Sequence, residues 1–290
     1  MPPVSGRAAR GEAWIAKLSN EHHPEPRTQN CGDLLARTLK LTISYDGTRF
    51  VGWQRQAEGV SVQGLLEDAL ARFEGAPVAV HGAGRTDAGV HALGQVASVR
   101  LTSAHPIDAV GRGLNASLPP DVRVTDVQEV TEEFHARFSA RSKTYRYQLR
   151  NATTVSPFER AYVWHVPEAL DLDAMRTAAH ALVGTHDFAA FRSTGSDTKG
   201  TVRTITRSEL SADEVGGWPH TSTGRLIGYE VSGDGFLRHM VRAIVGTLVE
   251  IGRGQRSAAS IAALVAGGSR SQAGITAPPQ GLFLVRVVYD

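Results

Sequence analysis

Residues 81–95 read HGAGRTDAGVHALGQ and form the densest group of glycines and polar side chains in the chain. Short apolar runs at 78–80 and 93–101 flank its glycine-rich part, HGAGRTDAGVH (81–91), and both are typical of strands. Gly82, Gly84 and Gly89 permit positive φ angles and close approach of the backbone. We therefore expect Asp87 to project from a tight loop between two strands.

Asp87 is the candidate catalytic residue of this loop. Arg85 lies two residues earlier and could pair with its carboxylate and keep it charged. A charged carboxylate in a cleft can act as a nucleophile or a base. The structural alternative is an Asx-turn, in which Asp87 only bonds the backbone of its own loop. The glycine spacing excludes a dinucleotide loop, because Asp87 stands where G-x-G-x-x-G needs glycine, and the chain has no P-loop motif.

Outward from this loop, strands and helices alternate along the chain. LKLTISYDG (39–47) alternates apolar and polar residues and ends in an Asp46-Gly47 turn, which is typical of a strand. Ser61 is suited to cap a helix over 61–73. Asp171 is expected to cap a second helix and Gly184 to end it. We also expect strands at 122–127, 143–149, 201–210, 226–231 and 282–289, and helices after Pro106, over 237–251 and after Ser257.

These elements predict an α+β fold. We expect two pseudo-related α/β halves, at 39–138 and 139–290, that form a central, mostly antiparallel mixed sheet flanked by helices. Residues 1–38 are rich in Pro, Ser, Asn, Glu and Arg, and we expect a flexible N-terminal extension with a short helix around 13–18.

Composition excludes several classes of protein. The chain has 290 residues, 41% of them hydrophobic, and a net charge of +2, which argues against extensive disorder. No apolar run approaches the ~18 residues of a membrane span, and the first residues lack the apolar region of a secretory signal. Cys31 is the only cysteine and the histidines form no H-E-x-x-H motif, so a metal enzyme is disfavoured. We expect a soluble cytoplasmic protein without membrane or metal partners.

Three further segments are candidates for binding. FHARFSARSKTYRYQLR (134–150) interleaves five basic residues with four aromatic ones and contains no acid, a pattern that suits RNA but also fits a half-buried strand. YDGTRFVGWQRQ (45–56) gathers arginine, glutamine and Trp53 at the end of a predicted strand. For Trp53 the structural alternative is a buried ring that packs over a loop. GFLRHMVRAIVG (235–246) places Arg238, His239 and Arg242 near the start of an apolar helix. Arg238 and Arg242 would share a face there and repel each other unless an anion lies between them, although a solvated face is the simpler explanation.

Taken together, these segments resemble the bacterial tRNA pseudouridine synthase A family. The matching strings include YDGTRFVGWQRQ, GAGRTDAGVHALGQV, FHARFSARSKTYRY, GFLRHMVRAIVG and the terminal QGLFLVRVVY, in the family's order from about residue 39 to the end. The resemblance implies the pseudouridine synthase fold, a homodimer that binds tRNA, and isomerisation of uridine to pseudouridine in the anticodon stem-loop, at tRNA positions 38, 39 and 40, without metal or cofactor.

The resemblance also implies roles for individual residues. Asp87 matches the catalytic aspartate, Arg85 the arginine that pairs with it and holds the flipped-out nucleotide, and Tyr145 the residue that stacks on the target uracil. The remaining substrate-binding candidates fall in strings that resemble those lining the RNA cleft: Trp53, Gln54, Arg238, His239 and Arg242.

The expected chemistry breaks a C–N glycosidic bond, rotates the uracil and rejoins it through C5. The aspartate could attack ribose C1′, attack uracil C6 or remove a ribose proton, and the sequence does not choose between these routes. A non-catalytic RNA-binding module, or a pseudouridine synthase with another RNA target, is the alternative function. A glycoside hydrolase or nucleosidase is disfavoured, because most glycosidases need a second positioned carboxylate. Residues 1–38 and a predicted long hairpin loop at 211–225 depart from the family pattern.

Overall fold

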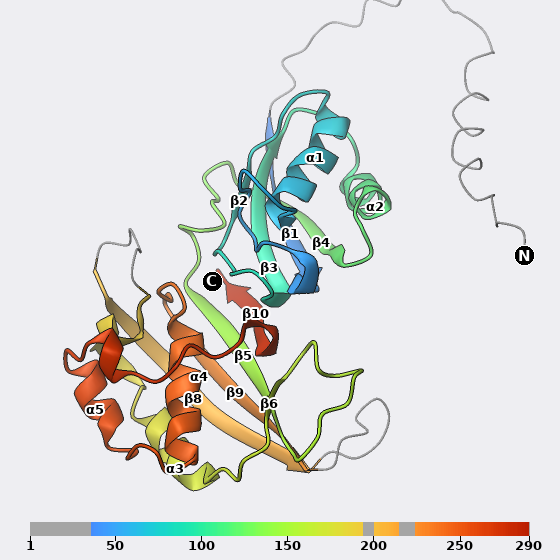
Figure 1. The fold of residues 1–290 in the computed structure, drawn as a ribbon. Helices are drawn as coiled ribbons and strands as arrows, with labels where there is room; N and C mark the ends of the chain where they lie inside the picture. The colour runs from blue at the N-terminus through green and yellow to red at the C-terminus, as the bar shows by residue number, and fades with distance from the viewer. Residues whose placement is uncertain (1–35, 194–199, 215–223, 290) are drawn as a thin grey trace, which may run out of the picture. The chain divides into compact units, whose positions relative to one another are not determined.

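The computed structural model describes residues 36–193, 200–214 and 224–289. The predicted N-terminal extension and its short helix lie almost entirely outside these residues. Residues Leu35–Asp290 form one compact unit. The described part is a mixed α+β structure with a ten-stranded, mostly antiparallel sheet, which confirms the predicted fold class (Figure 1).

The sheet has a continuous path of eight strands in the order β4-β1-β3-β10-β5-β9-β8-β7, and β2 and β6 pair with β3 and β5 outside that path. Along this path only β10 and β3 run parallel. The strands are β1 Arg37–Tyr45, β2 Val80–Gly82, β3 His91–Leu101, β4 Val122–Val130, β5 Ser142–Asn151, β6 Trp164–Val166, β7 Gly184–Asp187, β8 Val202–Glu214, β9 Arg225–Gly233 and β10 Leu282–Val288.

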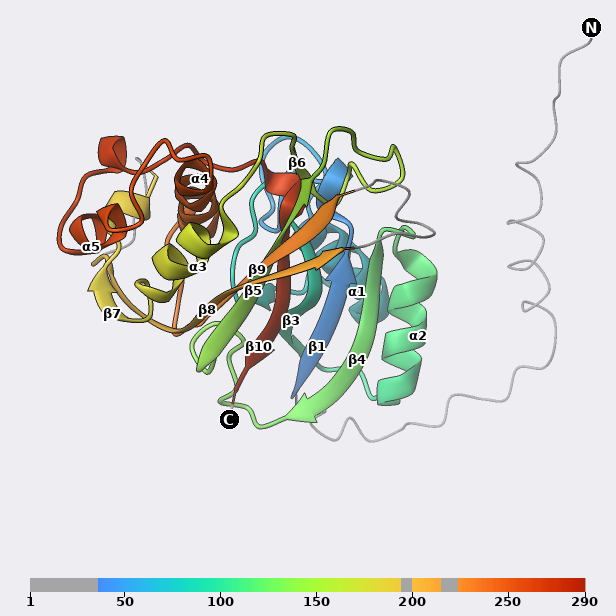
Figure 2. The same cartoon turned by 90° about the horizontal axis from the view of Figure 1, so that it is seen from below.

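The helices gather at the two ends of the sheet path. α1 and α2 accompany β4, β1 and β3, whereas α3, α4 and α5 accompany β9, β8 and β7 (Figure 2). No described helix is long and apolar enough to cross a membrane. The helices are α1 Val62–Glu74, α2 Ile107–Ser117, α3 Leu172–His180, α4 Met240–Gly252 and α5 Ser260–Val265, with 3-10 turns at Gly47–Arg49, Ala189–Phe191, Arg270–Gln272 and Pro279–Gly281.

Local signals in the sequence explain the starts of two helices. The Ser61 side chain accepts a hydrogen bond from the Gly64 amide and caps α1, and the Asp171 side chain caps α3 by accepting from the amides of Asp173 and Ala174. Leu66 and Leu70 of α1 are fully buried against the sheet, as the 3.6-residue period requires.

Three local predictions were wrong. α3 ends at His180 with Ala181 as its cap, and Gly184 instead opens β7 with φ +122°. α4 begins at Met240 and not near 237, because His239 adopts a left-handed conformation just before it. The predicted loop at 211–225 begins later, since β8 continues to Glu214 and pairs with β9 up to Arg225.

The predicted boundary between residues 138 and 139 falls in the segment that joins β4 to β5. The division into two pseudo-related halves stays a prediction. The first described strand, β1, begins at Arg37, two residues before the predicted start at residue 39.

Candidate active site

The loop at 83–90 joins β2 to β3 and carries Asp87. Ala83 donates its amide to the Val96 carbonyl at 2.7 Å, and Val90 donates to the Asp87 carbonyl at 3.2 Å, which closes a β-turn. Gly89 occupies the third position of this turn with φ +77°, a conformation that glycine adopts without a steric penalty. The loop is therefore a tight turn, as the glycines predicted.

The segment after β1 holds this loop from one side. Trp53 donates its amide to the Thr86 carbonyl at 3.1 Å, and the Thr86 hydroxyl lies 2.8 Å from the hydroxyl of Tyr45. Gly52 has φ +113°, and a Cβ there would stand 2.6 Å from the Thr86 oxygen. Gln95 adds a hydrogen bond from its side-chain amide to the Gly84 carbonyl at 2.9 Å. The backbone beside Asp87 is thus fixed by contacts from β1, β3 and the loop between β1 and α1.

The Asp87 carboxylate faces the start of α4. Arg242 donates from Nη1 to Oδ2 at 3.1 Å, and Nε2 of His239 lies 3.5 Å from Oδ1. Nε of Arg242 donates in turn to the Ala277 carbonyl at 2.7 Å, so the guanidinium is held at both ends. The described contacts of the carboxylate include no backbone amide, which argues against the Asx-turn alternative.

His239 is the only described non-glycine residue with a positive φ, at +63°. This conformation is uncommon for residues with a Cβ, and strained backbone of this kind is concentrated at functional sites. Burial lowers the pKa of His239, the negative charge of Asp87 raises it, and Arg242, Arg238 and Arg270 lower it further. The net pKa is lowered, so the imidazole is mostly neutral at pH 7.

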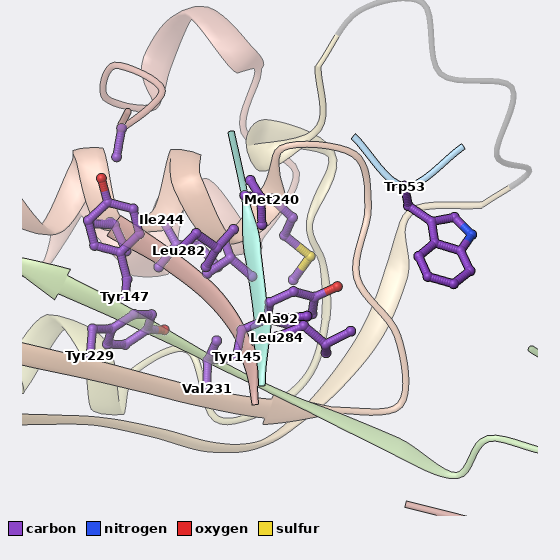
Figure 3. Packing of buried hydrophobic residues seen from close by; sticks show 14 of the residues in the cluster. Trp53, Ala92, Tyr145, Tyr147, Tyr229, Val231, Met240, Ile244, Leu282 and Leu284 are labelled. Carbon is purple, nitrogen blue, oxygen red and sulfur yellow. The ribbon is translucent and has the colours of Figure 1, made fainter. Parts of the chain in front are cut away.

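Tyr145 forms a wall of the same pocket. It lies in the middle of β5, in register with Leu284 of β10 and Val231 of β9, and its ring meets Phe236 edge-on at 5.1 Å. Figure 3 shows it within the buried cluster, close to Ala92 and Leu284. Burial raises its pKa, with smaller contributions from Tyr45 and Asp87, so the hydroxyl stays protonated. The strand pairing makes this ring a rigid surface beside Asp87.

One pocket brings together five of the eight predicted site residues. Arg85, Asp87, Tyr145, His239 and Arg242 all line it, together with Thr86, Val90 and the apolar residues Met240, Val241 and Leu282. Asp87 is 29% exposed and Arg242 is 13% exposed, so the carboxylate is reachable while its partner is mostly covered.

Arg85 is placed differently from the prediction. Its side chain is exposed, and among the described residues no hydrogen bond or ion pair joins it to Asp87. The cation that pairs with the carboxylate is Arg242, which comes from a distant part of the chain. Arg85 is therefore left on the pocket wall with its charge directed to solvent.

The other three predicted residues lie outside the pocket lining. Trp53 is buried, and a Cβ on Gly82 would stand 2.4 Å from its ring, so the ring packs against β2. The structural alternative expected it to be buried over a loop. Gln54 and Arg238 are exposed. Arg238 precedes α4 and so does not share a helix face with Arg242, contrary to the prediction. Their contacts with substrate stay predictions.

Sequence reasoning missed the residues that support the loop. Tyr45 and Gln95 are both buried, and both bond the segment that carries Asp87. The apolar character of the two predicted strands could have indicated that Tyr45 and Gln95 are buried. It could not have shown which polar groups they contact. Lys143 was also missed as a neighbour of this loop: its aliphatic chain lies 3.5 Å from where a Cβ on Gly84 would stand.

In the described parts of the chain, no three His, Cys, Asp or Glu side chains gather in a way that could hold a metal ion.

Comparison with known proteins gives one consistent answer. A family model described as tRNA pseudouridine synthase matches residues 41–139 and 178–290. A tRNA pseudouridine synthase A of Syntrophotalea carbinolica is 47% identical over 251 residues, which cover 87% of this chain and 96% of the relative. Proteins of the same name from Geotalea uraniireducens and Myxococcus xanthus are 45% and 48% identical, with 87% of this chain covered in both cases and 100% and 91% of the relatives. The chain therefore belongs to the tRNA pseudouridine synthase family, whose members are isomerases.

Proposed function

We propose that this protein isomerises uridine to pseudouridine in the anticodon stem-loop of tRNA, at tRNA positions 38, 39 and 40, with Asp87 as the catalytic nucleophile. The observation that carries the proposal is the position of Asp87 in its pocket. Its carboxylate is partly exposed beside the aromatic ring of Tyr145, on a turn that is fixed by contacts from several strands. The pocket belongs to a chain of the tRNA pseudouridine synthase family.

The reaction rearranges bonds without changing oxidation state. The bond from ribose C1′ to uracil N1 breaks, the base rotates, and a bond forms from C1′ to C5. The hydrogen on C5 leaves as a proton, and N1 gains one. Asp87 could attack C1′ or C6 to allow the separation, and it is regenerated when the new bond is complete. Because no electrons are gained or lost, the reaction requires no redox cofactor, and we propose that it proceeds without a cofactor or a metal.

Each pocket residue has a role in this scheme. Arg242 and His239 hold the carboxylate in place, and the guanidinium offsets its negative charge between turnovers. Tyr145 supplies an aromatic surface for the uracil. Arg85, exposed at the pocket wall, is free to contact the nucleotide or its phosphates. Extruding a base from a stem costs a few kcal/mol, which stacking and arginine contacts offset.

We also propose that the protein acts in the cytoplasm as a homodimer, with tRNA as its partner. Gln54 and Arg238 complete the proposed substrate contacts through their exposed side chains. Trp53 is buried and contributes indirectly, because its amide donates to the Thr86 carbonyl of the Asp87 loop.

A tritium-release assay tests the reaction. tRNA carrying tritium at uracil C5 is incubated with purified protein in the presence of a chelator. Formation of the C5 bond releases the label to water, so we expect release to rise with time and enzyme. Binding of the tRNA without release would contradict the proposal and favour a non-catalytic RNA-binding module.

Substrate position is tested with transcripts in which single uridines are retained. We expect release from tRNAs with uridine at 38, 39 or 40, and none when all three are replaced by cytidine. Release that persists in the triple replacement would show a pseudouridine synthase with another target.

A further inference from the structure

Phe138 is an unusually exposed aromatic side chain. It is 75% exposed, although burial of a phenylalanine normally stabilises a fold by a large amount of apolar area. The ring of His135 lies 4.4 Å from it, and the guanidinium carbon of Arg137 stands 5.5 Å from its centroid. The ring of His81 in β2 lies 5.1 Å from that of His135. We call these four side chains the Phe138 platform.

The backbone that carries the platform is fixed on the sheet. The Ala136 amide donates to the Ser98 hydroxyl of β3 at 3.1 Å, and the Tyr289 hydroxyl donates to the Ala136 carbonyl at 2.8 Å. Ala136 is fully buried. Nδ1 of His135 accepts from the Arg137 amide at 3.1 Å, which also fixes that ring. An exposed phenylalanine on rigid backbone is prepared for a contact, because little conformational entropy remains to be lost.

The platform is continuous with the active site. Val287 of β10 and Phe134 both pack against a small buried cluster of Ala83, Val96 and Ala136, and Val287 lies in register with Lys143 of β5. Residues that face each other across paired strands project from the same face of a sheet. The Lys143 chain passes beside Gly84, at the start of the loop that carries Asp87. The platform and the pocket therefore share one face of the sheet, with Lys143 between them.

The charges around the platform favour a polyanion. Burial lowers the pKa of Lys143, the nearby charges of Arg137 and Arg203 lower it further, and Asp234 raises it. A groove of about 480 Å³ lies between Phe134, Phe138, Arg141 and Tyr289, and Glu133 is the acid on its lining. That volume lies within the range of small-ligand sites.

We propose that Phe138 stacks against an unpaired nucleotide of the RNA substrate, with Arg137 and Arg141 binding its phosphates, at a site separate from the pocket that receives the target uridine. The inference rests on the proposed function. RNA is recognised largely through unpaired bases that stack on aromatic side chains, and arginine beside the ring binds the backbone. Arg137 beside the ring and Arg141 on the groove make a polyanionic ligand the better fit.

Substitutions at one position separate stacking from apolar burial. Steady-state kinetics with tRNA are measured for the wild type, F138A, F138L and F138Y. Loss of one stacked base weakens RNA binding on the order of tenfold, so we expect that rise in KM for F138A and for F138L, which keeps the apolar volume but not the ring. F138Y should stay within about twofold of the wild type, and kcat at saturating tRNA should be unchanged in all three.

Phe158 provides a matched control. It is 74% exposed and lies in the loop after β5, and among the described residues no ring or cation contacts it. F158A should leave KM within about twofold of the wild type. A second measurement uses R137Q, which should reduce the dependence of log Kd on log salt by about one unit.

Several results would overturn the inference. The inference fails if F138A or F138L has the KM of the wild type. It also fails if F158A raises KM as much as F138A does. A change in oligomeric state of F138A by sedimentation would assign the platform to a subunit interface. If the wild type itself releases no tritium, the proposed function fails, and direct tRNA binding by the same variants still decides whether the platform contacts RNA.

Discussion

Arg242 donates a hydrogen bond from Nη1 to Oδ2 of Asp87 across 3.1 Å, and the two residues are 155 positions apart in the sequence. The pair joins the loop between β2 and β3 to the first turn of α4. Arg242 is also tied to the Ala277 carbonyl by its Nε, so the carboxylate is held by a side chain that has little freedom of its own.

Replacing Arg242 should lower turnover with little effect on tRNA binding. A hydrogen bond to a charged group contributes roughly 1.5–3 kcal/mol, so R242Q should reduce kcat by about 10- to 100-fold. R242K should recover little of this, because lysine cannot donate to Asp87 and to Ala277 from a planar fork. Single-turnover tritium release at saturating enzyme measures the effect. A wild-type rate for R242Q would show that the pair does not support catalysis.

Arg238 should give the opposite pattern. It is four residues before Arg242 but exposed, and it lies outside the pocket lining. If it contacts a phosphate, R238A should raise KM for tRNA and reduce the salt dependence of log Kd by about one unit, while kcat stays unchanged. Filter binding over a range of salt concentrations measures this. A fall in kcat without a change in Kd would instead place Arg238 in the catalytic step.

Glycine at position 52 should be required for the position of the Asp87 loop as well as for the conformation of its own turn. An alanine there must adopt φ +113°, and its Cβ would stand 2.6 Å from the Thr86 oxygen, so the backbone next to Asp87 must move. Gly75 ends α1 with φ +68° and has open space around it, which makes it the matched control. G75A should cost about 1–2 kcal/mol of unfolding free energy for its φ in the left-handed helical region. G52A should cost more, because φ +113° lies outside that region and its Cβ also collides with the Thr86 backbone.

Only G52A should also lower kcat, because only its Cβ displaces the catalytic loop. Urea denaturation and tritium release on the two variants test this difference. Equal kcat values for G52A and G75A would contradict the proposed coupling between Gly52 and Asp87.

His91 should make the stability of the fold depend on pH. It is 1% exposed, accepts from the Gly47 amide through Nδ1 at 3.0 Å, and lies with Nε2 3.1 Å from the Gln280 carbonyl. Burial lowers its pKa, and the opposing effect of Asp46 does not restore it. The unfolded chain therefore binds more protons between the lowered pKa and the ordinary value near 6.5.

The contribution of neutral His91 to the free energy of unfolding is complete above the ordinary pKa, and it is lost as the pH falls through this window. Urea denaturation between pH 7.5 and pH 5.5 should show a falling free energy of unfolding, and H91Q should show a smaller fall. His135 and His239 also have lowered pKa values and account for part of the remaining slope. An identical slope for H91Q and the wild type would refute the assignment.

Local signals in the sequence predicted most of the elements, and distant contacts decided what they missed. The helix caps at Ser61 and Asp171 were predicted correctly, because a cap depends only on the next three backbone amides. The prediction that Gly184 ends α3 was wrong, because Gly184 pairs with β8 and is the first residue of β7. The end of β8 was placed too early because its last residues are polar, and strand pairing with β9 extends it to Glu214.

The same distinction applies to the site. The glycines of 81–95 are enough to predict a turn that exposes Asp87. Tyr145 and Arg242, which the resemblance suggested as substrate-binding residues, line the same pocket, and their roles there stay predictions. Arg85 was expected to pair with the carboxylate for two reasons, its nearness in sequence and the resemblance to the family. The structure assigns that pairing to Arg242, since the packing of α4 against the sheet brings residue 242 to the loop. Proximity in sequence is a weak guide to pairing when a sheet joins distant segments.

The proposed reaction depends above all on the Asp87 carboxylate. Tritium release from tRNA labelled at uracil C5 is measured for the wild type, D87N and D87A in parallel with circular dichroism and tRNA binding. Because Asp87 is partly exposed and its loop is fixed by backbone contacts, both variants should fold and bind tRNA within a few-fold of the wild type. We expect their release rates to fall by about a thousandfold or more. Release near the wild-type rate by folded D87N and D87A would contradict the account.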